Sequence, residues 1–414
     1  MKVLVIAFAI KPGGGSESAV GWTWVNEIAK VADHVTVLVR DAEGQRAAIE
    51  ESLRTKPLRN VEFVYYELPG FLKKMVKGET HTKQTGMRRY YLVWQFYSIF
   101  FLKRKLSLKT LNIIHHVTFP IDWIPSFYTL LGIKRVVLGP LGSNSFLPYA
   151  LHHPAKVFFK NVIANSIKFI LRWLNPLFRY NMIRADALIG ISAETRRKIG
   201  TRLLAKKFYH IPGVSVPEEL KPNPVYFPKS VPPRGDLIIF SACPFIYLKN
   251  VDLSIEAFYE YRKINLQAKF FIAGGGPLKE DLLALRDRLG LKESIIFLGW
   301  IKREEVFHTL KDSAHILLFP TSESGGTVSI EAMRCGVPVV CLEGYGYNYF
   351  VKDSRGSIAV PIHNRSQVIK GIADALDSIA RKLPEYSRYA YEESESFLPI
   401  RKRELIRKIY GSFM

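Results

Sequence analysis

Two glutamates in the last quarter of the chain have a spacing suited to binding a ligand rich in hydroxyl groups. Glu323 and Glu331 lie in "LLFPTSESGGTVSIEAMRCGVPVVC", with seven residues and a Gly-Gly step between them. Carboxylates accept hydrogen bonds from sugar hydroxyls, and glycine lets the backbone approach a ligand closely. The pair suits a nucleotide-sugar, which has hydroxyls at both ends and phosphates between. In the alternative interpretation Glu323 merely favours a helix dipole and Glu331 is a solvated helix residue.

The elements around the two glutamates must form a strand, a loop and a helix. "AHILLFPT" predicts a strand, "SESGG" a loop, "TVSIEAMRCG" a short helix that stops at Gly336, and "VPVVCLE" the next strand. The first turn of such a helix has unpaired N–H groups, which bind anions at the strand ends of α/β proteins. The segment therefore predicts a phosphate site beside the carboxylates.

The same unit of a short apolar run, a turn and an amphipathic helix recurs along the chain. The other runs are "KVLVIAFAI", "HVTVLVR", "VEFVYYEL", "LNIIHHVTF", "RVVLGPLG", "ALIGIS", "DLIIFSA", "AKFFIAGG" and "SIIFLGW". Continuously hydrophobic runs are typical of parallel strands buried on both faces. We predict an α/β protein of two doubly wound, Rossmann-like domains facing across a cleft. They span residues 1–212 and 236–395, joined by a proline-rich linker at 213–235 and followed by a helix at 396–414.

Composition narrows the class of protein. The 414 residues are 48% hydrophobic, carry a net charge of +22 and include three cysteines without a Cys-x-x-Cys pair, which favours a reducing cytoplasm. The first residues, "MKVLVIAFAI", run into a glycine turn and predict a strand rather than a signal peptide. A strong positive field attracts nucleic acid, an anionic membrane or phosphorylated small molecules.

The segment "ESGGTVSIEAMRCGVPVV" resembles the glutamate-pair motif of the family-4 retaining glycosyltransferases with the GT-B fold. The resemblance extends through "GGGSESAVGWTWVNEIAK", "HHVTF", "VVLGPLG", "LKNVDLSIEAF" and "IAGGGPL". It implies a transferase that takes a UDP- or GDP-linked sugar and needs no further cofactor. It also implies that Glu323 contacts the donor sugar and Glu331 the ribose. The amides of Gly325, Gly326 and Thr327 would hold phosphate or sugar.

Lys249, in "YLKNVDLSIEAF", is expected by the same resemblance to bind the diphosphate. A fixed cation there would stabilise the charge that develops on the leaving group; the alternative is a solvated lysine at a helix start. The family usually has an arginine about five residues earlier, but "SACPFIY" contains none. Either another cation substitutes, or phosphate binding is weaker, or activity has been lost.

Glycine turns and strand ends supply further candidates. Gly14 and Gly15 would approach the donor phosphates or the acceptor, although a plain turn is the alternative. An NAD site is a second alternative, with Asp41 as its acidic residue. Gly299 and Ile301, in "FLGWIK", resemble the loop that meets the base through backbone groups.

His115, His116 and Thr118 end the fourth apolar run, in "LNIIHHVTF". A histidine at the carboxyl end of a parallel strand can bond a sugar hydroxyl, so we favour His116 as a catalytic residue and assign His115 and Thr118 to the acceptor side. Neighbouring strand residues point to opposite faces, which leaves the register open. The alternative is that these histidines are satisfied within the core.

The expected mechanism uses no metal. The sequence has no DxD motif and no His/Cys cluster at metal-ligand spacing. We expect front-face displacement, in which the acceptor hydroxyl attacks from the side that the nucleotide leaves.

Two segments mix cations with aromatic residues and predict contact with an anionic membrane surface. In residues 71–109, Tyr90, Trp94, Tyr97 and Phe101 fall on one helical face beside basic residues, and residues 156–180 are similar. The alternative is a core-facing stripe. We predict a cytoplasmic transferase that is peripheral on the inner face of the plasma membrane and extends a glycan or lipid-linked acceptor. A catalytically weakened partner protein is the second interpretation. A nucleic-acid binder, suggested by charge alone, lacks a supporting motif.

Overall fold

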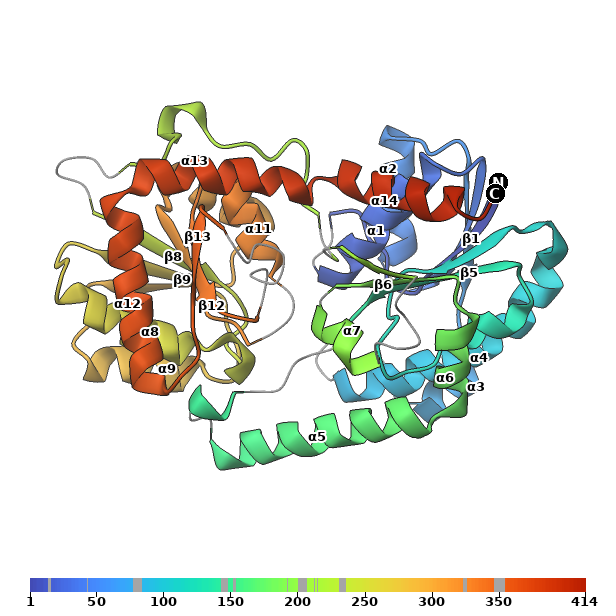
Figure 1. The fold of residues 1–414 in the computed structure, drawn as a ribbon, viewed down its shortest axis with the longest axis horizontal. Coiled ribbons are helices and arrows are strands. Elements are labelled where there is room, and N and C mark those ends of the chain that lie inside the picture. Colours follow the sequence, from blue (N-terminus) through green and yellow to red (C-terminus); the bar gives the residue numbers. More distant parts are fainter. Residues whose placement is uncertain are drawn as a thin grey trace. The chain divides into compact units, whose positions relative to one another are not determined.

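The computed structural model describes residues 1–13, 16–42, 44–76, 84–142, 148–151, 154–191, 193–199, 207–211, 213, 215–230, 236–322, 326–345 and 354–414. The chain forms two compact units, each built on its own sheet (Figure 1). The first unit comprises Met1–Ser143, Ser166–Val214 and Pro399–Met414, and the second comprises Asn144–Asn165 and Ser215–Leu398. This division differs from the predicted domains in two respects, because Asn144–Asn165 and most of the predicted linker group with the second unit.

The first sheet has seven strands in the order β3-β2-β1-β4-β5-β6-β7, and its strand pairs are parallel. The strands are β1 Lys2–Ala7, β2 His34–Arg40, β3 Val61–Tyr66, β4 Ile113–His116, β5 Arg135–Leu141, β6 Ala187–Gly190 and β7 Phe208–His210. The helices are α1 Ser16–Ala29, α2 Gln45–Thr55, α3 Gly70–Val76, α4 Gln84–Lys105, α6 Pro176–Arg184, α7 Ala193–Ile199 and α14 Pro399–Gly411. The α5 helix, Ala155–Leu174, is shared between the two units.

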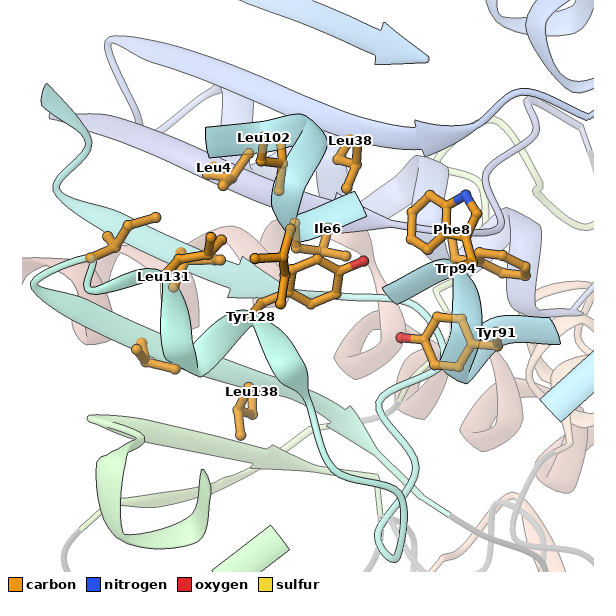
Figure 2. Close-up of a cluster of buried hydrophobic side chains, with 14 of the residues drawn as sticks. Leu4, Ile6, Phe8, Leu38, Tyr91, Trp94, Leu102, Tyr128, Leu131 and Leu138 are labelled. Atoms are coloured by element: carbon orange, nitrogen blue, oxygen red, sulfur yellow. The ribbon is translucent and has the colours of Figure 1, made fainter. Parts of the chain in front are cut away.

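Both faces of the first sheet are buried, as its continuously apolar strands predict. Along β1, Val3 and Val5 pack in one core cluster with Trp24 of α1. Leu4 and Ile6 pack in the other, shown in Figure 2, together with aromatic side chains of α4. Alternate residues of a strand point to opposite faces, so one strand contributes to both cores.

The aromatic stripe of α4 belongs mainly to this second core. Tyr90 and Trp94 are fully buried, and Phe101 stacks on Tyr66 with 4.8 Å between ring centroids. Tyr97 remains partly exposed. The predicted membrane contact through this stripe is therefore wrong for Tyr90 and Trp94, because the first sheet covers them.

The second sheet has six strands in the order β10-β9-β8-β11-β12-β13, again with parallel pairs. The strands are β8 Ile238–Ala242, β9 Lys269–Ala273, β10 Ile295–Gly299, β11 Ile316–Leu318, β12 Val339–Leu342 and β13 Ser357–Val360. The helices are α8 Val251–Arg262, α9 Lys279–Arg288, α10 Arg303–His308, α11 Thr327–Arg334, α12 Arg365–Arg381 and α13 Leu383–Ser394. The three cysteines are buried and form no disulfide, namely Cys243, Cys335 and Cys341.

The predicted linker is in part a packed element of the second unit. Val216 and Leu220 are buried, and the Leu220 carbonyl accepts a hydrogen bond of 2.9 Å from Arg334 Nε in α11. Phe227 packs edge-on against Tyr391 of α13. Residues 215–230 therefore do not behave as a free linker, although their proline content suggests one.

The last helix, α14, packs against α1 and buries a lysine. Lys402 is 1% exposed, and its ammonium lies 5.8 Å from the centre of the Trp24 ring. Burial lowers the pKa of Lys402 to about 7, an effect that nearby Glu27 partly opposes. Glu27 is itself bound by Lys30 Nζ at 2.6 Å and Arg403 Nε at 2.8 Å. Replacing Lys402 would therefore leave no unpaired carboxylate.

We expect Lys402→Met to raise the free energy of unfolding at pH 7 by about 1–3 kcal/mol, because a buried charge is replaced by an apolar chain of similar length. Between pH 7 and the ordinary lysine pKa of 10.5, Lys402 keeps its ammonium proton in the unfolded chain and releases it in the folded chain. The free energy of unfolding of the wild type therefore rises with pH in this range. The difference in unfolding free energy between Lys402→Met and wild type becomes smaller toward pH 10. Urea unfolding at both pH values measures this, with exposed Lys408→Met on the same helix as control. A variant that is less stable than wild type at pH 7 would contradict the assignment.

Candidate active site

The second sheet changes winding direction between two neighbouring strands, β8 and β11. The chain runs from β8 outward to β9 and β10, and then returns to β11 on the other side of β8. Ligands of doubly wound sheets bind at the carboxyl ends of such strands. Lys249 follows β8 and the glutamate loop follows β11. The topology thus brings together two motifs that are more than seventy residues apart in the sequence.

The turn that carries Lys249 is bonded directly to the residues that precede the glutamate loop. This turn, Tyr247–Lys249, is a single turn of 3-10 helix. The Leu248 carbonyl accepts from Ser322 N at 2.8 Å and from Thr321 Oγ1 at 3.2 Å. Lys249 is therefore held at a fixed position relative to the start of the loop that contains Glu323.

Asn250 strengthens the same connection. It adopts a left-handed conformation with φ of 50°, and its side chain is buried. Its Nδ2 donates to the Pro320 carbonyl at 2.6 Å and to Ser322 Oγ at 2.8 Å. The Lys249 ammonium lies 5.1 Å from the centre of the Phe319 ring, at the end of β11. The cation is thus positioned at the switch point between β8 and β11.

Glu331 is a buried carboxylate with a cationic partner. It lies in α11 and is 5% exposed, and Arg303 Nη2 donates to its Oε1 at 2.5 Å. Burial raises the pKa of Glu331, and the Arg303 guanidinium opposes that rise. The structure therefore excludes the alternative that Glu331 is a solvated helix residue. Arg303 was not among the residues predicted from sequence, although it closely follows the predicted base-binding segment "FLGWIK".

The backbone at the proposed donor site is partly described. Gly326 is the residue before α11 and Thr327 is its first residue, and both are half-buried. Gly299 has a φ of +68°, which favours glycine, and its carbonyl accepts from Gly274 N at 2.7 Å. Ile301 is half-buried. The predicted site residues Glu323, Gly325, Gly14 and Gly15 lie outside the described residues.

A glycine loop fixes the segment in which the family arginine would be expected. Phe245 N donates to the Gly275 carbonyl at 2.8 Å, and a Cβ on Gly274 would lie 1.9 Å from the Cys243 carbonyl oxygen. Phe245 itself is 1% exposed. The segment before Lys249 thus presents a buried aromatic ring instead of a cation. Arg303 is a second cation at this end of the sheet: Lys249 follows β8 and Arg303 follows β10.

His115 has both ring nitrogens engaged inside the first unit. Its Nε2 lies 3.0 Å from the Gly139 carbonyl, which can only accept, so Nε2 donates. Its Nδ1 lies 2.8 Å from the Tyr410 hydroxyl of α14 and accepts that proton. Burial lowers the pKa of His115 to about 3, so the ring is neutral at pH 7. The contacts favour the core-satisfied alternative over an acceptor-side role.

His116 and Thr118 are likewise buried and bonded to protein groups. His116 Nε2 contacts the Tyr91 hydroxyl, and its Nδ1 lies 2.9 Å from Ser126 Oγ. Burial lowers the pKa of His116 to about 3. Thr118 Oγ1 accepts from Ala9 N at 3.1 Å. In this structure His116 is therefore not placed to meet a sugar hydroxyl, which contradicts its predicted catalytic role.

Most of the second unit is similar in sequence to known sugar transferases. Residues 223–393 match the family model of glycosyl transferases group 1. A Schizosaccharomyces pombe protein, the phosphatidylinositol N-acetylglucosaminyltransferase gpi3 subunit, is 29% identical over 169 residues, which are 40% of this chain and 36% of that protein. The D-inositol 3-phosphate glycosyltransferase of Mycobacteroides abscessus is 35% identical over 130 residues, which are 30% of this chain and 28% of that enzyme. The matched segments thus span about a third of these relatives.

Solved structures resemble the whole chain. Anabaena HepE in complex with UDP and glucose aligns with a TM-score of 0.61 and 16% identity, covering 100% of both chains. A mutant of S. aureus TarM, in a complex that includes UDP, aligns with a TM-score of 0.62 and 12% identity, covering 100% of this chain and 99% of TarM. At these identities the likeness shows a shared fold.

Proposed function

Because residues 223–393 match the family model of glycosyl transferases group 1 and the chain has the GT-B fold, we propose that this protein is a retaining glycosyltransferase. It moves a sugar from a nucleotide-sugar to a glycan or lipid-linked acceptor in the synthesis of cell-surface polysaccharide or glycolipid. The observation that carries the proposal is the placement of the Lys249 turn and the Glu331–Arg303 pair at the carboxyl ends of the second sheet.

The donor is held through its ribose, its phosphates and its sugar. Glu331 accepts hydrogen bonds from the ribose hydroxyls, because a buried carboxylate paired with Arg303 is a strong acceptor. Lys249 and the amides of Gly326 and Thr327, at the start of α11, bind the diphosphate. Glu323 contacts the transferred sugar, and Gly325 belongs to the same phosphate-binding loop. Backbone groups near Gly299 and Ile301 meet the base.

The chemistry is a front-face displacement without a metal ion. The acceptor hydroxyl approaches the anomeric carbon from the side of the nucleotide, and its oxygen forms the new glycosidic bond as the bond to the phosphate oxygen breaks. The acceptor proton passes to that departing phosphate oxygen. Lys249 and the helix amides stabilise the negative charge of the released diphosphate. The anomeric configuration is retained, and no protein nucleophile is needed.

The acceptor and location remain part of the proposal. The names of two relatives specify phosphatidylinositol and diacylglycerol as acceptor chemistry, and this supports a lipid-linked acceptor here. A protein with a net charge of +22 is attracted to anionic lipid surfaces. We place the enzyme in the cytoplasm, peripheral on the inner face of the plasma membrane.

A catalytically weakened partner protein is the second candidate. The buried Phe245 before Lys249, in the segment where the family resemblance implies an arginine, favours this alternative. A donor screen separates the two. The protein is incubated with UDP- and GDP-sugars and a bacterial lipid extract, with and without EDTA, and sugar transfer to lipid is measured.

The proposal predicts that sugar is transferred from one of the donors and that EDTA does not change the rate of this transfer. The Glu323→Gln variant should be folded but should transfer no sugar. Transfer that is equal in Glu323→Gln would contradict the site assignment. Nucleotide binding without transfer from any donor would favour the weakened partner.

A further inference from the structure

The α5 helix has its polar side chains turned inward and its apolar side chains turned outward. The buried positions are Asn165, Lys168 and Arg172, all less than a tenth exposed. These residues recur every three or four positions and therefore share one face of the helix. In a helix of a water-soluble domain, the buried stripe is normally apolar. Here the arrangement is reversed.

The inward polar groups have defined contacts. Arg172 Nε donates to the Asp122 carbonyl at 2.8 Å, and its Nη2 lies 3.1 Å from Oδ2 of the fully buried Asp122. Asn165 Nδ2 donates to the Asn161 carbonyl at 2.9 Å. Burial lowers the pKa of Lys168 to about 8. The Arg172–Asp122 pair fixes the rotation of α5, because turning the helix would leave a buried carboxylate without its cation.

The outward face is a continuous apolar stripe. Four residues follow one another at spacings of four, three and four, namely Ile163, Ile167, Ile170 and Leu174, and more than half of each is exposed. The stripe is widened by other exposed apolar side chains of α5 and α6, namely Phe159, Phe169, Trp173, Tyr180 and Ile183. Scattered exposed hydrophobic residues are normal, but a patch of this extent marks a contact surface.

The charge of this segment indicates which partner covers it. Residues 155–184 contain no aspartate or glutamate, and their six cations are Lys156, Lys160, Lys168, Arg172, Arg179 and Arg184. A second copy of the same face would bring like charges together. An anionic lipid surface supplies both an apolar layer and complementary charge. Lys156 and Lys160 are exposed and continue the line of the apolar stripe toward the start of α5.

We propose that the outward face of α5, extended by α6, docks this protein on an anionic lipid bilayer. The inference rests on the proposed work at a lipid surface and names the part of the chain that makes the contact. None of the helices in the described part of the chain is long and apolar enough to cross a membrane. Because its exposed face is apolar and has a basic border, the α5 helix lies in the plane of the interface, as amphipathic helices of this kind do.

Sedimentation with lipid vesicles tests the proposal on the full chain. Wild type is mixed with vesicles of phosphatidylcholine alone or with phosphatidylglycerol added, at low and high salt. We expect binding to the anionic vesicles that weakens in high salt. Replacing Ile163 and Ile167 together by aspartate is expected to weaken it by about tenfold or more. Lys156→Gln and Lys160→Gln are each expected to weaken it about fivefold at low salt.

A matched control and a second readout keep the result interpretable. Ile264→Asp changes an isoleucine of comparable exposure in the second unit and should bind like wild type. The Trp173 ring should enter the lipid, so wild type shows a blue shift in tryptophan fluorescence that Trp173→Phe reduces. Circular dichroism confirms that each variant is folded.

Three outcomes would overturn the proposal. In the first, the wild type does not bind anionic vesicles. In the second, the aspartate variants bind them as strongly as the wild type does. In the third, the wild type is a dimer in solution and the aspartate substitutions dissociate it. The assay contains no nucleotide or sugar, so a failure of the proposed transferase activity does not affect it. Conversely, a wild-type protein that does not bind anionic vesicles but transfers sugar to a short-chain, water-soluble acceptor would sink this inference alone.

Discussion

Replacing Lys249 by alanine is expected to lower kcat by about 100- to 1000-fold, the effect of removing one preorganised group that stabilises transition-state charge. The turn that holds this lysine is bonded to Thr321 and Ser322 through the Leu248 carbonyl, so the cation is fixed before the substrate arrives. With no arginine in the preceding segment, Lys249 carries more of the neutralisation than it would beside a second cation. Donor turnover under saturating acceptor measures the effect.

Two further variants make the Lys249 result specific. Lys263→Ala removes an exposed lysine that pairs with Glu260 at the end of α8, and it should leave kcat unchanged. Lys249→Arg keeps the charge and should recover part of the activity. A folded Lys249→Ala protein with wild-type kcat would show that the leaving group is neutralised elsewhere.

Replacing Glu331 by alanine is expected to weaken nucleotide binding by about 10- to 100-fold, the effect of losing hydrogen bonds to a charged group. The carboxylate is 5% exposed and already held in place by Arg303, so it accepts hydrogen bonds from ribose hydroxyls without further reorganisation. Arg303 is partly exposed, and once unpaired it can turn to water. The variant should therefore stay folded, and calorimetric titration separates lost binding from lost structure.

The partner of Glu331 gives a pH signature for the same site. Burial raises the pKa of Glu331, and Arg303 opposes the rise. In Arg303→Met this opposition is removed, so protonation of Glu331 begins at a higher pH. The neutral acid accepts fewer hydrogen bonds. As the pH is lowered, nucleotide binding should therefore begin to weaken at a higher pH in Arg303→Met than in wild type. Identical pH profiles would show that Arg303 does not act through Glu331.

The strands could be predicted because their signal is local. All eleven apolar runs identified in the sequence contain strands of the two sheets. The two strands that were missed, β7 and β13, are short and lie at sheet edges, where a strand is buried on fewer sides and needs less apolar sequence. The helix stop at Gly336, which has a φ of +72°, was also predictable because glycine tolerates that conformation.

The partners of the histidines could not be predicted in the same way. His115 is satisfied by Tyr410, which is 295 residues away in the sequence, and His116 by Tyr91 and Ser126. The histidines end a strand, as predicted, but which groups meet them depends on how α14 and α4 pack. Position at a strand end was therefore insufficient evidence for a role in catalysis.

The candidate active site and the proposed docking surface also depend on contacts between distant residues, which the sequence does not reveal. Lys249 and Glu331 were found from sequence motifs, whereas Arg303 became evident only from its contact with Glu331 in the folded chain. The sequence of α5 shows a polar and an apolar face, but it does not say which is buried. That choice is made by Asp122, which binds Arg172 and turns the polar face inward.

The measurement that tests the central claim most directly is calorimetric titration of the wild-type protein with UDP, GDP and ADP. We expect either UDP or GDP to bind at one site with a Kd near 10 µM, equivalent to about −7 kcal/mol, and ADP to bind much more weakly. We also expect Glu331→Ala to abolish most of that heat. If none of the three binds to the folded protein, the second unit has no nucleotide site and the account of this chain as an active transferase is wrong.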